Sequence, residues 1–407
     1  MKQFKFIILF CFTGMTIFAQ SVSYYIEEYN NPALTHMQRL EMLEIVQGYG
    51  ETGLGEFYHN ALKILNPKLP DLGNREDREA AEVSARIICQ GLAAEKYTAA
   101  ANDVWYLVQF FDVVKGINDG FVMQEALITM GQIGANNYLV NIVRWLDDMN
   151  TRETSDSESR RRIQRAVVGA ISALEALHHP DGFRPVFFAH IGWYDPSIKA
   201  MASSAMINIL EDPGEVISKM IQDPSNSPSI KLIALESMLR TNAPNESKAK
   251  VAAVALATGW NYSTSSLPGR RDLAEMRKSA IMTIGKLGAA DNSVYTNLDK
   301  SYNNNFISTV TDYDEIRVTL ETLSLIKTDE AVNLLLKYLR DLNHRRRTGS
   351  WGVLKERQSF NWVIAGLGAS GTQSMDVRML LSSIQRSQDY TGAEQNWARD
   401  ALKQLGY

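Results

Sequence analysis

The chain has few of the residues and none of the motifs that usually mark an enzyme. It contains 2 Cys and 6 His among 407 residues, and no GxSxG, HExxH, CxxC or P-loop sequence occurs in it. Cys89 lies in an apolar helical pattern, where a buried, unreactive thiol is expected. If Cys11 is removed with the N-terminus, as proposed below, no intramolecular disulfide can form.

Long apolar runs are also scarce, and the one that stands out is at the N-terminus. The run from Phe6 to Phe18 follows two lysines and precedes Ala19, a small residue suited to cleavage. It is shorter than the roughly 20 apolar residues that span a bilayer. We predict a signal peptide over residues 1–19 and a periplasmic or secreted protein. An uncleaved anchor, or a lipoprotein formed at Cys11, remains an alternative.

Alternating strand patterns are absent, and helical periodicity runs from about residue 35 to the end. One phrase recurs in this region. Ala126–Gly134 reads ALITMGQIG and Ala280–Gly288 reads AIMTIGKLG. Weaker copies begin at Ala170, Ala205, Ala234, Thr319 and Phe360. A phrase that recurs every 20 to 50 residues or so predicts a stacked array of supersecondary units rather than a globular enzyme core.

Turn residues divide the periodic region into helix pairs. The expected pairs cover residues 35–65, 75–115, 120–149, 159–193, 196–222, 227–259, 271–303, 313–342 and 354–387, with a last helix over 392–405. We therefore expect a signal peptide over 1–19, an atypical helical cap over 20–74 and one helical array over 75–407.

Three pairs resemble HEAT repeats, in which an apolar helix, a turn and a second Leu-rich helix alternate. They are Ala126–Gly134 with 136–147, Ala280–Gly288 with 292–302, and Thr319–Ile326 with 329–342. The resemblance implies an all-α fold, a right-handed α-solenoid of about nine antiparallel helix pairs closed by a C-terminal helix. By analogy it also implies protein binding along a groove, although a fold does not by itself define a function.

Two patterns could be mistaken for cofactor or metal sites. Gly366–Gly371 matches GxGxxG but ends a helical pattern, where a dinucleotide site needs a preceding strand. Glu56 with His59 and Glu175 with His178 have the Glu-x-x-His spacing of di-iron sites, but they are about three repeats apart. We predict no cofactor and no metal site.

Basic clusters provide a stronger signal. Each is expected just before the first helix of a pair, so that together they form a broken basic edge. The clustered residues are Arg160, Arg161, Arg162, Arg270, Arg271, Arg345, Arg346 and Arg347, with Trp351 and Lys355 after the last cluster. Such an edge favours an anionic partner, whereas solvated loops with nearby acids are the alternative. Nucleic acid is not expected, because the net charge is −4 and export is predicted.

Aromatic residues are the second set of candidates. Trp260 and Tyr262 lie near an expected inter-pair loop, and interfaces favour Trp, Tyr and Arg. Phe187-Phe188 and Trp193-Tyr194 fit a second helix and are expected in the core.

Taken together, these patterns predict a non-enzymatic exported scaffold or adaptor that binds protein partners in the cell envelope. Binding of an anionic lipid or envelope polymer through the basic edge is one alternative. An enzyme subunit with an unrecognised site is the other. The sequence does not identify the partner.

Overall fold

The structure is a computed structural model that describes residues 22–115, 118–289, 291–307, 312–352 and 354–407. Within these ranges every regular element is helical, with twenty α-helices, four short 3-10 helices and no strand. The predicted all-α class is therefore confirmed, in an α-solenoid type of arrangement. None of the described helices is both long and apolar enough to cross a membrane. The predicted signal peptide, with Cys11, lies outside the described residues.

The chain forms two compact units, the first ending at Leu210 and the second running from Glu211 to Tyr407. The helices of the first unit are α2 Val22–Tyr29, α3 His36–Tyr49, α4 Gly55–Leu65, α5 Arg75–Ala94, α6 Ala101–Phe110, α7 Phe121–Gln132, α8 Leu139–Thr151, α9 Ser157–Leu177, α10 Phe183–Ile191 and α11 Pro196–Ile209. Those of the second are α12 Gly214–Gln222, α13 Pro228–Arg240, α14 Asn245–Asn261, α15 Leu267–Leu287, α16 Ser293–Ile307, α17 Tyr313–Ile326, α18 Asp329–Arg347, α19 Lys355–Ala369, α20 Met375–Arg386 and α21 Gly392–Gln404.

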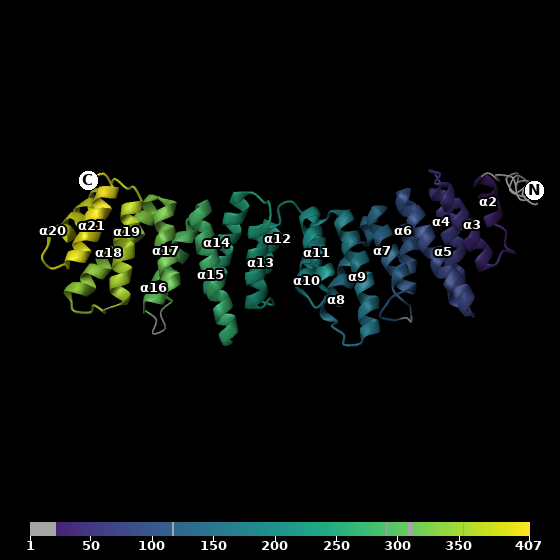
Figure 1. Cartoon of the computed structure of the whole chain (residues 1–407), viewed down its shortest axis with the longest axis horizontal. Coiled ribbons are helices and arrows are strands. Elements are labelled where there is room, and N and C mark those ends of the chain that lie inside the picture. Colours follow the sequence, from purple (N-terminus) through teal and green to yellow (C-terminus); the bar gives the residue numbers. More distant parts are fainter. Residues whose placement is uncertain (1–21, 116–117, 290, 308–311, 353) are drawn as a thin grey trace, which may run out of the picture. The chain divides into compact units, whose positions relative to one another are not determined.

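Within each unit the helices form two layers. The odd-numbered helices pack in a row, α3 to α11 in the first unit and α13 to α21 in the second, each contacting the next odd helix. Even-numbered helices make up the other layer, with contacts such as α8 to α10 and α12 to α14. Figure 1 shows the helices of each unit side by side in chain order. The apolar stripes predicted from periodicity face the space between the layers.

The expected helix pairs are shifted by one helix relative to the closest contacts between consecutive helices. These contacts join an even helix to the odd helix that follows it, as in α6 to α7, α10 to α11 and α14 to α15. The boundary between the two units falls within the expected pair over 196–222, with α11 in the first unit and α12 in the second. Apolar periodicity defines the buried face of a helix but does not specify which neighbour covers that face.

Glycines make some of these close contacts possible. A Cβ atom at Gly91 of α5 would lie 2.4 Å from the Tyr58 ring of α4, and one at Gly259 of α14 would lie 2.5 Å from Cγ of Arg277 in α15. A side chain at either position would push the two helices apart.

The recurring phrase contains two glycines with different roles. The first lies inside an odd helix and faces the next odd helix. A Cβ at Gly131 would approach Ala173 Cα to 2.6 Å, one at Gly285 would approach Thr322 Oγ1 to 2.8 Å, and one at Gly368 would approach Ala401 Cα to 2.9 Å. These glycines therefore set the spacing of the odd-helix layer.

The second glycine of the phrase ends the helix. Gly134, Gly288 and Gly371 have φ angles of 69°, 99° and 67°, a region that glycine enters without strain. Gly371 follows the end of α19, so the GxGxxG match is a helix terminus, as predicted.

Candidate functional site

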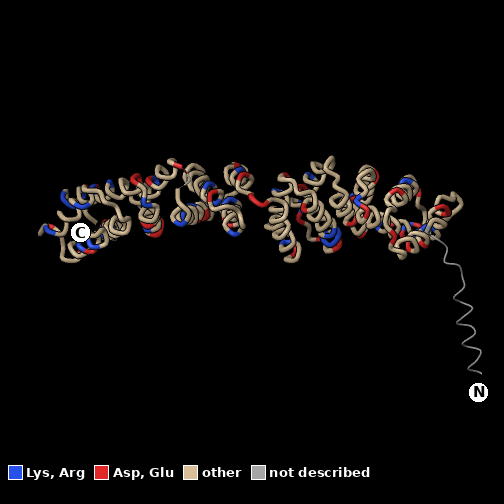
Figure 2. Tube along the Cα trace, turned by 90° about the horizontal axis from the view of Figure 1, so that it is seen from above, with Lys and Arg blue, Asp and Glu red and all other residues tan. Residues whose placement is uncertain are grey.

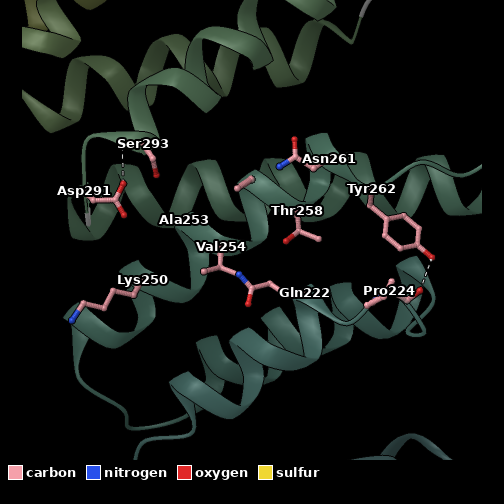
Figure 3. Close-up of a pocket in the computed structure, with 11 residues that line it drawn as sticks. Gln222, Pro224, Lys250, Ala253, Val254, Thr258, Asn261, Tyr262, Asp291 and Ser293 are labelled. Atoms are coloured by element: carbon pink, nitrogen blue, oxygen red, sulfur yellow. Dashed lines mark hydrogen bonds between the residues drawn. The ribbon is translucent and has the colours of Figure 1, made fainter.

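The candidate site is a groove in the even-helix layer of the second unit (Figure 3). Its volume is about 740 Å³, and it lies over α14 between the end of α12 and the start of α16. The lining residues are Gln222, Pro224, Lys250, Ala253, Val254, Ala257, Thr258, Asn261, Tyr262, Asp291 and Ser293.

The periodicity of α14 explains why this face is open. Its buried residues include Val251, Ala252, Ala255 and Leu256, which pack into the unit. Lys250, Val254, Ala257 and Asn261 follow one another at steps of three or four and form a second stripe on the groove side. Two alanines line the groove, and their short side chains leave room above the helix.

Three polar side chains on the groove have no partner in the described part of the chain. Gln222, Thr258 and Asn261 make no side-chain hydrogen bond to any described residue. Figure 3 shows them around the hollow, from α12 and α14. Two charged groups are engaged, since Lys250 lies 2.7 Å from Glu246 and Asp291 accepts a bond from the Ser293 amide at 2.7 Å. The Ser293 hydroxyl, like the three side chains above, makes no hydrogen bond to a described residue. Each free amide offers one carbonyl acceptor and an NH₂ donor to a ligand.

Lys250 is the basic side chain of the groove. Its hydrogen bond with Glu246 raises the pKa of Lys250, which keeps this lysine protonated and unsuited to act as a base. Tyr262 closes one end, with its hydroxyl 3.4 Å from the Pro224 carbonyl oxygen. No group of three or more His, Cys, Asp or Glu side chains in the described ranges is placed to hold a metal ion.

The two predicted aromatic candidates differ in place, since Tyr262 lines the groove and Trp260 packs within the unit. Trp260 donates from Nε1 to Ser301 Oγ at 2.8 Å, and the guanidinium carbon of Arg277 lies 4.1 Å from its ring centroid. Under the ring of Tyr262 lies the buried Lys231, 4.9 Å from the centroid. The half-buried Trp260 therefore joins α14 to α15 and α16 rather than offering its ring to a partner.

Sequence reasoning missed the ion pair behind Trp260. Arg277 donates from Nε and Nη2 to both carboxylate oxygens of Glu315 at 2.8 and 2.9 Å, and from Nη1 to the Gly259 carbonyl at 3.1 Å. The Glu315 side chain is 0% exposed and that of Arg277 is 12% exposed. The available signal was an Arg and a Glu separated by 38 residues, about one repeat.

The basic clusters lie in helical turns, whereas the sequence placed them in loops just before a helix. Arg160, Arg161 and Arg162 are inside α9, and Arg270 and Arg271 are inside α15. Both helices begin earlier than expected, because Asp156 and Ser266 cap their first turns. Arg345, Arg346 and Arg347 form the last turn of α18, the opposite end of a helix. In chain order, each cluster still lies next to the junction that leads into an odd helix, α9, α15 or α19, although in a helical turn and not in the loop.

Several of these arginines are bound within their own unit. Arg160 donates to the Trp193 carbonyl at 2.9 Å, and Arg345 pairs with Asp341 at 2.9 Å. Arg346 pairs with the buried Glu394 and lies over the rings of Trp351 and Tyr390 at 5.4 and 4.8 Å. Trp351 is thereby committed to an internal contact.

The remaining basic candidates are distributed differently. Arg162 donates to Ser159 Oγ at 3.0 Å, and Lys355 lies 5.1 Å from the Phe306 ring centroid. Arg161, Arg270, Arg271 and Arg347 are the exposed members. Figure 2 shows basic and acidic residues interspersed along the tube in each unit.

The Glu-x-x-His pairs have separate partners. His59 Nε2 lies 2.8 Å from Asp103 Oδ2, whereas Glu175 accepts a bond from Asn208 at 2.5 Å. Cys89 is fully buried, as predicted, and burial raises the pKa of its thiol to about 12, which disfavours the reactive thiolate. Of the four expected core aromatics, Phe187 and Tyr194 are buried, while Phe188 and Trp193 are half-buried.

Comparison with known proteins adds little to this description. No protein-family model matches the chain, and no curated protein matches it. Among solved structures, the crystal structure of an engineered protein is similar over 95% of this chain and 99% of its own length, with 15% identity and a TM-score of 0.34. Likeness at that level supports no argument about fold or function, so the groove and its contacts carry the functional argument.

Proposed function

We propose that this protein is an exported, non-enzymatic scaffold related to HEAT-repeat proteins, with about nine right-handed helix pairs. Two layers of helices with a recurring Gly-containing phrase support the repeat reading. The N-terminal pattern of residues 1–19 supports export to the periplasm or beyond.

We further propose that the groove over α14 holds an extended polypeptide segment of an envelope protein. The observation that carries this proposal is the set of unpartnered side chains of Gln222, Thr258 and Asn261 beside a floor of small residues. An extended chain presents one N–H and one C=O per residue, which two amides and a hydroxyl complement. Ala253 and Ala257 leave space for the chain to approach closely.

A blocking variant tests the site. Ala257→Trp fills the groove, whereas Ala393→Trp places the same side chain at an exposed position in the first turn of α21. A photo-crosslinking residue at Val254 in cells identifies the partner by mass spectrometry, and one at Met282 of α15 serves as the control. We expect a distinct partner to crosslink at Val254 and to lose binding only with Ala257→Trp. Equal crosslinking at both positions, or full binding by Ala257→Trp, would contradict the proposal.

A second pair of variants tests recognition of the peptide main chain. Each hydrogen bond contributes about 0.5–1.5 kcal/mol, so Gln222→Ala with Asn261→Ala should weaken binding about tenfold. Scrambling the partner segment should weaken it less. A partner that binds the double variant as well as the parent would show that the groove is used without these amides.

Binding of an anionic lipid or polymer is the alternative function. It is favoured by Arg270 and Arg271, which are exposed in the first turns of α15 and make no ion pair with the described residues. It predicts cosedimentation with anionic vesicles that declines steeply with salt, and no such binding to neutral vesicles.

A further inference from the structure

A second hollow, in the first unit, has the features of a small-molecule site. Its volume is about 250 Å³. Five of its eight described lining residues are apolar, and they come from the 3-10 helix Asn66–Asp71, the end of α6 and the residues after each of them. They are Leu69, Pro70, Leu72, Phe110 and Phe111, and the polar lining residues are Arg78, Glu82 and Asn118.

Glu82 differs from every other polar group around this hollow. It is half-buried on α5 and makes no hydrogen bond or ion pair with the described residues. Arg78 donates from Nε to the Leu72 carbonyl at 3.0 Å, and Asn118 donates to the Phe111 carbonyl at 3.2 Å. One turn earlier, Glu79 pairs with Arg75 at 2.6 Å.

The surroundings of Glu82 favour a cation. Burial raises the pKa of its carboxyl group, and the negative charges of Asp119 and Glu79 raise it further, against a smaller opposing effect of Arg78. A positive ligand group beside Glu82 would relieve both the desolvation and the repulsion. A ligand carboxylate would instead add a third repulsive neighbour.

We propose that this hollow binds a small primary ammonium ion with an apolar body, its nitrogen on Glu82 and its body against Phe110, Phe111 and Leu72. An ammonium group has three N–H donors, and the Glu82 carboxylate accepts no hydrogen bond from the described residues. Burial of the apolar body of the ligand against these side chains removes apolar surface from water, which favours binding. For scale, an apolar cavity of about 150 Å³ holds benzene, so this hollow accommodates one ring with a short chain.

The test uses the full chain and three probes of similar size. They are 2-phenylethylammonium, 3-phenylpropanoate and the neutral 2-phenylethanol, followed by ligand-observed NMR and calorimetry. We expect the ammonium to bind at least about tenfold more tightly than the other two. We also expect Glu82→Gln to remove about tenfold of that affinity, a change of 1.4 kcal/mol. Glu44→Gln, at an exposed position of α3 that does not line the hollow, is the control and should bind within about twofold of the parent.

Several outcomes would overturn the proposal. They are equal or tighter binding of the carboxylate, unchanged ammonium binding by Glu82→Gln, an equal loss in Glu44→Gln, or no binding of any probe. Leu72→Trp fills the apolar part and should abolish binding while circular dichroism stays that of the parent. The site lies in the first unit, so Ala257→Trp in the second should bind the ammonium normally, and failure here leaves the polypeptide groove untouched.

Discussion

The two faces of helix α14 differ in how their polar and aromatic side chains are engaged: one face packs inside the unit, and the other lines the open groove. Trp260 is half-buried and bonded to Ser301, with Arg277 stacked on its ring and paired to the buried Glu315. Asn261, the next residue, is exposed on the groove and has no partner among the described residues. Trp and Arg, two residue types that interfaces favour, are used here inside the protein, whereas mainly small and polar residues line the groove, with Tyr262 at one end.

This contrast follows from the cost of burial. Trp260 lies at the end of α14 and Arg277 in the middle of α15, and covering both side chains there removes apolar area from water. Once covered, the guanidinium group needs a carboxylate and carbonyl partners, which Glu315 and Gly259 supply. An open groove instead retains residues that tolerate water until a partner arrives.

The largest effect is expected from removing the buried ion pair between Arg277 and Glu315. Arg277→Ala leaves the carboxylate of Glu315, 0% exposed, without its partner. We expect a loss of about 3–5 kcal/mol in the free energy of unfolding of the second unit. Urea denaturation followed by Trp fluorescence measures it. Arg317→Ala removes exposed pairs with Asp314 and Glu321 and should cost less than about 1 kcal/mol. Equal losses of unfolding free energy in the two variants would show that the buried pair stabilises the unit no more than an exposed pair does.

A smaller effect on stability is expected from Gly→Ala changes, and its sign should depend on whether a neighbouring helix lies against the glycine. Gly131→Ala places a Cβ 2.6 Å from Ala173 Cα in the next odd helix, whereas a Cβ at Gly48 of α3 meets nothing within 4 Å. We expect Gly131→Ala to destabilise by about 1–3 kcal/mol through overpacking. Gly48→Ala should instead stabilise by up to about 1 kcal/mol, since alanine favours the helix. Thermal melts of the two variants compare them directly, and a stabilised Gly131→Ala would contradict the close approach of α7 and α9.

The smallest effect is expected on the exposed basic residues. Reversing Arg270 and Arg271 to Glu should change stability by less than about 0.5 kcal/mol. Any loss of binding to anionic vesicles in this variant would then report on the surface alone. Reversal of Arg345, Arg346 and Arg347 is a poorer test, because Arg346 pairs with Glu394, whose side chain is 2% exposed, and its reversal should destabilise α21. Circular dichroism of both variants checks this difference.

Much of the fold was predictable, and the misses have specific causes. The helical class, the helix ending at Gly371 and the buried Cys89 followed from periodicity and local turn chemistry, which act within one or two turns of chain. The start of α9 was misplaced because its cap, Asp156, lies in a polar stretch that reads as a loop. The sequence patterns pair each odd helix with the even helix after it, whereas the odd helix packs more closely against the even helix before it. Periodicity could not distinguish these two neighbours, because either one can cover the apolar face of the helix.

The candidate site was less predictable than the fold. Gln222, Thr258 and Asn261 belong to no motif, and they become a group only because α12 and α14 lie side by side. Arg160, Trp260 and Arg346 were reasonable binding candidates by composition, yet each is held by residues about a repeat or more away. Local sequence patterns show neither which side chains find a partner nor which remain without one.

The sequence by itself determined that this chain is helical, where most of its helices lie and which glycines end them, because those features depend on interactions between residues close in the chain. Only the tertiary structure decided the rest: the division at Leu210, the packing role of Gly131, Gly285 and Gly368, the internal use of Arg277 and Trp260, and the two open hollows. The physical reason is that burial and pairing depend on which helices meet. Residues a whole repeat apart settle that question, and no short stretch of sequence contains both partners.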